Sequence, residues 1–204
     1  MDRKTHWEGI YKTKGVRDVS WFAPHLSASL RFILSTGIKK SDPILDVGAG
    51  ASTLVDDLLH EGYTDISLLD ISAEALGIAK GRLGQKASQV HWIEEDVTNA
   101  HLPKNKYALW HDRAVFHFLT DAQDRQKYRQ LLSDAIQHKG YAIIAVFSLD
   151  GPPKCSGLNV VRYSPETLAR ELGADFTLLQ SSTENHRTPF ETIQKFTYCQ
   201  FQRV

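Results

Sequence analysis

Short apolar runs of strand length alternate with segments of helical periodicity from about residue 40 onward. The apolar runs fall at 44–47, 66–69, 90–93, 107–110 and 141–147. After the first run, apolar residues recur at helical spacing while acidic residues occupy the opposite face. Strand and helix alternate in this order five times, which predicts an α/β fold with a doubly wound parallel sheet.

Three of the predicted helices carry start and stop signals. The segment 72–84 runs from an N-cap serine to a terminal glycine. The segment 120–140 has apolar residues at i, i+3, i+4, i+7 and i+8, namely Tyr128, Leu131, Leu132, Ala135 and Ile136. The segment 164–173 starts with a serine cap and a proline at the first helical position, and it ends at a glycine.

Both ends of the chain depart from this alternation. Residues 1–40 precede the first strand and contain a predicted helix, one side of which carries Leu26, Leu30, Ile33 and Leu34. The late runs 176–179 and 196–201 have no clear helix between them, which predicts an antiparallel hairpin at a sheet edge. Prolines and glycines predict a long loop over 150–159. We therefore divide the chain into an N-terminal extension, 1–40, and a domain, 41–204.

Composition narrows the function without identifying it. The 204 residues are 42% hydrophobic and 24% charged, and the 24 basic residues balance the 24 acidic ones. A net charge of zero argues against binding nucleic acid through bulk positive charge. The longest apolar run, 141–147, is far too short to span a membrane. Two cysteines, Cys155 and Cys199, do not make a disulfide framework. We expect a cytoplasmic protein with no metal site, and its oligomeric state stays open.

The segment 43–54 combines a strand, a glycine-rich turn and the start of a helix. Gly48 and Gly50 lack the Cβ atoms that would keep a ligand away from the backbone, and the helix N-terminus offers unpaired N–H groups. A dinucleotide fingerprint would place a small residue where Thr53 stands. Asp46 fits an ammonium group better than a pyrophosphate. The turn therefore favours S-adenosylmethionine, which carries an amino-acid moiety, over NAD.

Acidic residues also follow the next two predicted strands. Asp70 ends the second strand, where an acid accepts hydrogen bonds from ribose hydroxyls. Asp96 follows the third strand and can accept from the exocyclic amine of adenine, while Val97 can pack on the ring. A lone aspartate at a strand end is usually only a helix cap. Acids after three successive strands, together with the glycine turn, predict a nucleoside cofactor.

These residues resemble the class I S-adenosylmethionine-dependent methyltransferases over about 41–204, most specifically in the ILDVGAG segment at 44–50. The resemblance implies a Rossmann-like, seven-stranded sheet in the order 3-2-1-4-5-7-6, with strand 7 antiparallel. We expect cofactor contacts from Asp46, Gly48, Ala49, Gly50, Ser52, Asp70, Ile71, Asp96, Val97 and His111. The resemblance also implies an aromatic lid, for which Trp7, Tyr11 and Trp21 are candidates. Ordinary packing of these three against the sheet edge is the alternative.

The stretch 110–118, after the fourth predicted strand, holds the candidate catalytic residues. His111 and His117 are candidate general bases, and a structural histidine is the alternative for each. Arg113 can bind an anionic substrate or pair with an acid. Asp112 can act beside it or cap the following turn. The stretch lacks the Asn/Asp-Pro-Pro-aromatic motif of amino-methyltransferases that act on nucleic acids, which lowers support for that class.

Asp112-Arg113-Ala114 resembles a motif of the thiopurine, thiol and halide methyltransferase branch, in which a glycine stands at the position of Ala114. The sequence therefore favours methyl transfer to a small-molecule acceptor, with soft nucleophiles such as a thiol or sulfide among the candidates. Such nucleophiles need no general base. A protein-lysine methyltransferase and a non-catalytic S-adenosylmethionine-binding sensor are the alternatives. The acceptor atom, the use of a base and the pathway stay open.

Overall fold

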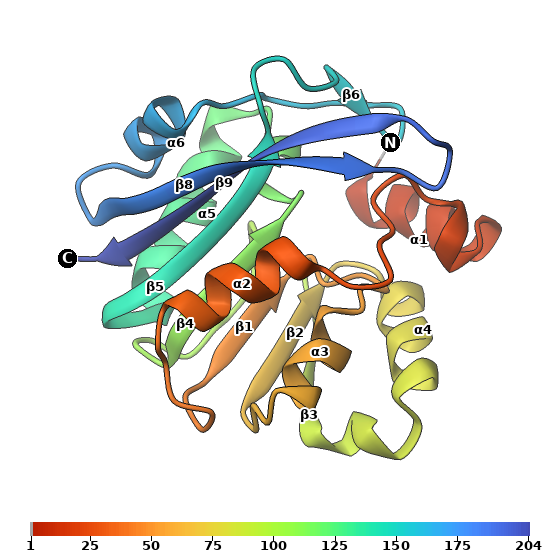
Figure 1. Ribbon diagram of the computed structural model, residues 1–204, viewed down its shortest axis with the longest axis horizontal. Helices are drawn as coiled ribbons and strands as arrows, with labels where there is room; N and C mark the ends of the chain where they lie inside the picture. The colour runs from red at the N-terminus through yellow and green to blue at the C-terminus, as the bar shows by residue number, and fades with distance from the viewer. Residues whose placement is uncertain (1) are drawn as a thin grey trace.

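Seven strands form the main sheet of the computed structural model, which describes residues 2–204 (Figure 1). The strands are β1 (Ile44–Val47), β2 (Ile66–Asp70), β3 (Val90–Glu94), β4 (Tyr107–Arg113), β5 (Ile136–Phe147), β8 (Phe176–Arg187) and β9 (Ile193–Arg203). Their order is β3-β2-β1-β4-β5-β9-β8. The first five pair in parallel, and β9 lies antiparallel between β5 and β8. The predicted order and its antiparallel strand are confirmed.

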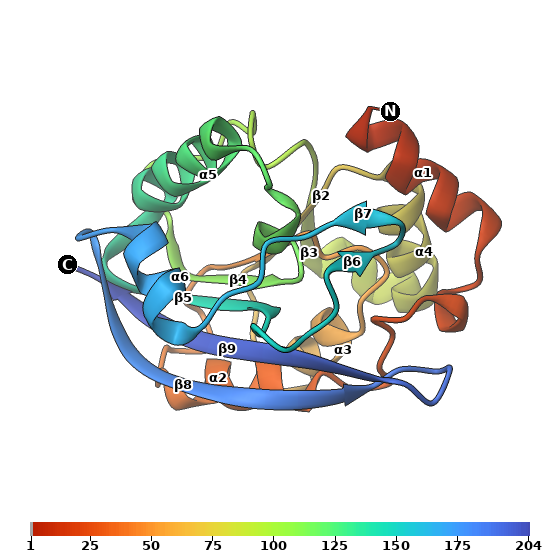
Figure 2. The same ribbon diagram turned by 90° about the horizontal axis from the view of Figure 1, so that it is seen from above.

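Helices cover both faces of the sheet. They are α1 (Arg3–Thr13), α2 (Ser27–Ser35), α3 (Leu54–His60), α4 (Ala73–Leu83), α5 (Ala122–Ala135) and α6 (Pro165–Leu172), with short 3₁₀ turns η1 (Val16–Asp18), η2 (Gly84–Gln89) and η3 (Phe116–Phe118). Viewed from above, α5 and α6 lie on one side of the sheet, and α2 and α3 lie on the other (Figure 2). None of the helices within residues 2–204 is both long enough and apolar enough to cross a membrane.

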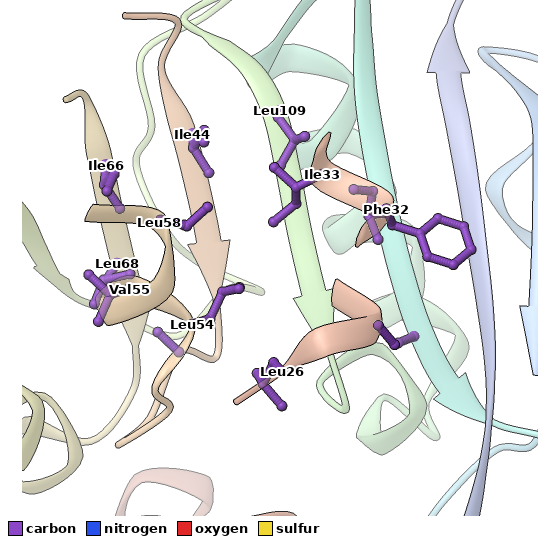
Figure 3. Close-up of a cluster of buried hydrophobic side chains, with 14 of the residues drawn as sticks. Leu26, Phe32, Ile33, Ile44, Leu54, Val55, Leu58, Ile66, Leu68 and Leu109 are labelled. Carbon is purple, nitrogen blue, oxygen red and sulfur yellow. The ribbon is translucent and has the colours of Figure 1, made fainter. Parts of the chain in front are cut away.

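Apolar side chains from three parallel strands and two helices build one half of the core (Figure 3). Ile44, Ile66 and Leu109 come from β1, β2 and β4, and they lie against Ile33 of α2 and Leu58 of α3. All five are fully buried. Strands covered on both faces need apolar side chains in both directions, which explains why these runs show no polar alternation.

The boundary between α5 and β5 differs from the prediction. The helix was expected to continue to about 140, but α5 ends at Ala135 and the chain enters β5 at the next residue. The backbone N–H groups of Asn105 and Lys106 donate to the carbonyl oxygens of Asp134 and Ala135. Because these bonds take two of the last helical carbonyl oxygens, the chain can leave the helix and pair with β4.

The C-terminal hairpin is longer than predicted. β8 and β9 have 12 and 11 residues, so residues 184–187, which lie between the two predicted runs, belong to β8. Residues 180–187 of β8 are all polar, and this edge strand therefore lacks the apolar run of an inner strand. The expected loop 150–159 contains a small antiparallel pair, β6 (Lys154–Cys155) and β7 (Leu158–Asn159).

The N-terminal extension contributes to the core through α2. Ile33 is fully buried, but Leu34 is 43% exposed, so the expectation that both lie on the packed side is wrong for Leu34. Adjacent residues are rotated by about 100° around the helix axis. Leu34 follows the buried Ile33 directly, and this rotation turns its side chain toward solvent. The division into 1–40 and 41–204 stays a prediction.

Substitutions at these adjacent positions test how α2 is docked. Ile33→Ala should lower the free energy of unfolding by about 2–5 kcal/mol, because it removes methyl groups from a closed core. Leu34→Ala should change it by less than about 0.5 kcal/mol. Urea unfolding followed by circular dichroism measures both. Similar losses for the two variants would contradict the observed orientation of the helix.

Candidate functional site

The glycine turn after β1 has a backbone that other residues adopt poorly. Gly48 and Gly50 have φ angles of +61° and +53°. A Cβ atom on Gly48 would stand 1.9 Å from Cγ2 of Val115, and one on Gly50 would stand 2.4 Å from the hydroxyl of Tyr11. Both positions therefore require glycine, because the backbone is in the left-handed region and because neighbouring side chains lie too close for a Cβ atom.

Asp70, at the end of β2, holds this turn in place. Its Oδ2 accepts a hydrogen bond from the N–H of Gly50 at 2.8 Å, and its Oδ1 accepts one from the N–H of Ser72 at 2.8 Å. Burial raises the pKa of Asp70 to about 6. Each carboxylate oxygen keeps a second lone pair, so the same group can also accept from a ligand hydroxyl.

The main pocket opens at the carboxyl ends of β1, β2 and β4 and has a volume of about 860 Å³, including space open to solvent. Eight predicted cofactor residues line it: Trp7, Tyr11, Trp21, Gly48, Asp70, Ile71, Asp96 and Val97. A second pocket of about 550 Å³ is lined by Asp46, Ala49, Ser52 and His111, among others. The two pockets share Tyr11, Trp21, Gly48 and Arg113. Gly50 lines neither of them.

Asp46 and His111 form a buried pair beside the second pocket. Nδ1 of His111 lies 2.6 Å from Oδ1 of Asp46, and its Nε2 lies 2.9 Å from Oγ of Ser29. Within residues 2–204, Oδ2 of Asp46 makes no hydrogen bond. Both ring nitrogens of His111 are thus engaged, which does not suit the predicted role as a general base. One oxygen of Asp46 is available to a cation.

The structure places two other catalytic candidates in the core. The carboxylate of Asp112 accepts hydrogen bonds from the N–H groups of Val115 and Phe116 and from the hydroxyl of Tyr128, so it caps the turn. Burial raises the pKa of Asp112 to about 6. His117 is fully buried, its Nδ1 accepts from a backbone N–H, and burial lowers its pKa to about 3. Neither residue lines either of these two pockets, so the geometry favours the alternatives for both, a turn cap for Asp112 and a structural histidine for His117.

Arg113 is the substrate-side candidate that reaches both pockets. Its Nε donates to the hydroxyl of Tyr198 and its Nη1 to the carbonyl of Trp21, both at 3.1 Å. The guanidinium lies 4.6 Å from the ring centroid of Phe196. Nη2 is buried without a hydrogen-bond partner, and no carboxylate within residues 2–204 forms an ion pair with this side chain. Arg113 therefore presents a donor for which the surrounding protein supplies no acceptor.

Ala114 occupies the position at which a glycine stands in the motif that it resembles. Its φ is +73°, in the left-handed region that favours glycine. Its N–H donates to the carbonyl of Ala145 on β5 at 2.9 Å. The departure from the motif therefore carries backbone strain.

The sequence did not predict most of the residues that line the main pocket around Arg113. This part of the main pocket is lined by Val115, Phe118, Phe147, Cys155, Gln194 and Phe196. Phe147 and Phe196 are register partners across β5 and β9, a pairing that depends on the hairpin registration. The acids that line the main pocket lie at the ends of two neighbouring strands, Asp70 as the last residue of β2 and Glu95 and Asp96 directly after β3. The pocket thus has an acidic end and an apolar end that contains Arg113.

Helix α1 lies over the main pocket. The Trp7 ring makes edge contacts with Trp21 and Phe118, at centroid distances of 5.8 and 5.1 Å. Arg3 pairs with Asp124 and lies 3.7 Å from Asp96. The position of α1 over the pocket agrees with the expected lid. That α1 acts as a lid stays a prediction. Asp96 also accepts from the N–H and the hydroxyl of Thr98, both at 2.8 Å.

A family model described as a methyltransferase domain matches residues 44–140, from the start of β1 into β5. This stretch contains the glycine turn and all three acid-bearing strand ends. The chain thus contains a methyltransferase domain, which supports the predicted class I S-adenosylmethionine-dependent methyltransferase family. The prediction of an S-adenosylmethionine-dependent methyltransferase is thereby confirmed.

Known proteins similar to this methyltransferase differ in substrate. The mouse (Mus musculus) "eEF1A lysine and N-terminal methyltransferase" is 25% identical over 126 residues, which are 62% of this chain and 18% of that protein. The chain thus spans about a fifth of the length of that relative. A structure from work on "Conversion of a Disulfide Bond into a Thioacetal Group during Echinomycin Biosynthesis" has a TM-score of 0.81 at 15% identity, covering 99% and 92% of the two chains.

A second solved structure is the Burkholderia thailandensis 1,6-didemethyltoxoflavin-N1-methyltransferase with bound 1,6-didemethyltoxoflavin and S-adenosylhomocysteine. Its TM-score is 0.72 at 16% identity, and the match covers 98% of this chain and 87% of that chain. At these identities both structures show the fold alone.

The residues of this methyltransferase fit S-adenosylmethionine. The two glycines add no side chain of their own to the turn, against which Val115 and the hydroxyl of Tyr11 lie, and a buried carboxylate stands at the end of β2. Oδ2 of Asp46 is uncommitted beside the second pocket, where the ammonium of the cofactor can bind. The main pocket offers Asp70 to ribose hydroxyls and Val97 to the adenine ring.

A substitution in the turn tests its geometry. Gly48→Ala should lower the free energy of unfolding by roughly 2–4 kcal/mol, since it adds a left-handed backbone penalty to an overlap with Val115. Adding Val115→Ala to this variant should restore only the part of the lost unfolding free energy that comes from the overlap with Val115. Gly77→Ala is the matched control, because a Cβ on this α4 glycine meets nothing within 4 Å and favours the helix. Comparable losses at the two glycines, measured by urea unfolding, would refute the close approach.

Proposed function

We propose that this protein transfers a methyl group from S-adenosylmethionine to a small acceptor with a soft, anionic nucleophile such as a thiolate or hydrosulfide. The observation that carries the proposal is the buried, unpartnered Nη2 of Arg113, a residue that lines the main pocket. A buried donor without an acceptor has a high free-energy cost, and a bound anion removes that cost.

The cofactor would lie across both pockets. We assign the adenosine to the part of the main pocket that contains Asp70 and Val97, and the amino-acid moiety to the second pocket beside Asp46. The shared residues Gly48 and Arg113 then lie near the reacting carbon. When bound, S-adenosylmethionine supplies an electrophilic methyl group on a sulfonium and a neutral thioether as leaving group.

The protein's own part in the reaction is orientation and exclusion of water. Trp7 and Phe118 close one wall of the pocket, and Phe147 closes another. Enclosure of this kind strengthens the attraction between Arg113 and an anion. The two histidines expected as bases are engaged or in the core, which favours an acceptor that arrives without a proton to lose.

Protein-lysine methylation is the second candidate, and the similarity to the eEF1A methyltransferase supports it. A lysine presented as an ammonium would approach the guanidinium of Arg113, and the like charges would repel each other. The acids that could attract an ammonium lie at the opposite end of the pocket. This distribution of charge favours the anionic acceptor.

Methyl-labelled S-adenosylmethionine offered with sodium sulfide, 2-mercaptoethanol or purified eEF1A tests the proposal. We expect label in methanethiol, the volatile product from hydrosulfide, or in the thioether formed from 2-mercaptoethanol. Label on eEF1A alone would establish the protein-lysine alternative. Calorimetric binding of S-adenosylhomocysteine without label in any acceptor would favour the sensor alternative, and tight binding of NAD instead would overturn the cofactor assignment.

The role of Arg113 has a matched test. Arg113→Gln keeps a donor but removes the charge, and should lower kcat/KM for hydrosulfide roughly ten-fold or more, the effect of losing a charge-assisted hydrogen bond. Arg187→Gln, on an exposed side chain of β8, should leave it unchanged. If kcat/KM for hydrosulfide is unchanged in the Arg113 variant at saturating cofactor, the assignment of Arg113 to the acceptor site is wrong.

A further inference from the structure

A continuous chain of hydrogen bonds joins the two pockets through the interior of the protein. It runs from Nε of Arg113 to the hydroxyl of Tyr198 (3.1 Å) and on to Oγ of Ser29 (3.2 Å). Ser29 bonds to Nε2 of His111 (2.9 Å), and Nδ1 of His111 bonds to Asp46 (2.6 Å). Tyr198 and Ser29 are fully buried, and His111 and Asp46 are 1% and 3% exposed.

Which group donates in each hydrogen bond follows from the two ends of the chain, Arg113 and Asp46. Arg113 can only donate and the carboxylate of Asp46 accepts, so the Nδ1 proton of His111 faces Asp46. With this proton on Nδ1, Nε2 of His111 can accept from the hydroxyl of Ser29, which can in turn accept from Tyr198. In this arrangement every donor in the chain points toward Asp46.

Four separate elements supply the chain. Asp46 lies on β1, His111 and Arg113 on β4, Ser29 on α2 and Tyr198 on β9. The ring of Tyr198 stacks on Phe32 of α2 at 5.5 Å between centroids. Burial raises the pKa of Tyr198, so its hydroxyl stays protonated and can donate. Packing thus fixes the middle of the chain, and its two ends meet the pockets.

We propose that Tyr198, Ser29 and His111 are positioning residues that couple the cofactor site at Asp46 to the acceptor site at Arg113, so that each ligand strengthens binding of the other. This inference rests on the proposed function, which assigns the cofactor ammonium to Asp46 and an anion to Arg113. The chain holds both groups in place and joins their charges through aligned, polarised bonds.

The sign of the coupling follows from charge. Without ligands, the carboxylate of Asp46 and the guanidinium of Arg113 partly compensate each other along the chain. An ammonium at Asp46 cancels the negative end and leaves Arg113 a stronger site for an anion. An anion at Arg113 leaves Asp46 a stronger site for an ammonium. Linkage requires the two enhancements to be equal.

Calorimetry with unreactive probes measures this coupling. S-adenosylhomocysteine is titrated into the protein in chloride-free buffer, with and without saturating thiocyanate, a small soft monoanion. We expect thiocyanate to tighten S-adenosylhomocysteine roughly five-fold or more. 5′-Methylthioadenosine, which keeps the nucleoside but lacks the ammonium and carboxylate, should show less than a two-fold change.

Variants then test the chain itself. Tyr198→Phe keeps the ring and removes the central hydroxyl, and Ser29→Ala breaks the next link. Both should still bind S-adenosylhomocysteine, but with a thiocyanate effect below two-fold. Tyr163→Phe is the matched control, because Tyr163 is a buried tyrosine whose hydroxyl has no partner within residues 2–204, and it should keep the full coupling.

The outcomes separate this inference from the proposed function. Failure of the unmodified protein to bind S-adenosylhomocysteine at all would overturn the proposed function. Normal binding with no thiocyanate effect, or equal coupling in the Tyr198 and Ser29 variants, would overturn the positioning role alone. Coupling to methylthioadenosine as large as that to S-adenosylhomocysteine would show that the ammonium is not its origin.

Discussion

Buried carboxylates at the ends of β1, β2 and β4 fix the geometry on which the whole site depends. A carboxylate removed from water must be matched by donors, or its burial costs more than the fold can sustain. Asp70 is matched by the glycine turn and the start of α4, and Asp112 by the backbone of η3. Asp46 is matched by His111. Each acid therefore ties a strand end to neighbouring structure, and the pocket walls adopt one arrangement.

The sheet could be predicted from the sequence because its inner strands are covered on both faces. β1 and β2 are buried at every residue, so their apolar runs stand out. β8 alternates exposed and partly buried residues, and only its first residues look like a strand. The end of α5 depends on bonds from Asn105 and Lys106, some 30 residues earlier, which no local pattern contains.

The side chains that meet the pockets depend on how far β4 extends. The sequence predicted that this strand ends at 110, which does not define where the side chains of the next three residues point. In the structure, β4 continues to Arg113. Alternation along the strand then turns His111 and Arg113 toward α2 and β9, and turns Asp112 toward Tyr128 on α5. These polar residues do not look like a buried strand, because their partners are far away in the sequence. The glycine turn, in contrast, is local and could be predicted.

Helix α1 covers the pocket without burying any residue of its own, whereas α2 places Phe32 and Ile33 in the core. The ion pair between Lys4 of α1 and Glu94 is exposed to solvent, and exposed ion pairs contribute little to stability. Edge contacts of Trp7 add about 0.5–1.5 kcal/mol each. Displacing α1 would cost less packing than displacing any element of the sheet, because none of its residues is buried. Because neither the glycine turn nor the chain from Asp46 to Arg113 includes a residue of α1, the predicted lid movement of this helix would leave the binding groups in their positions.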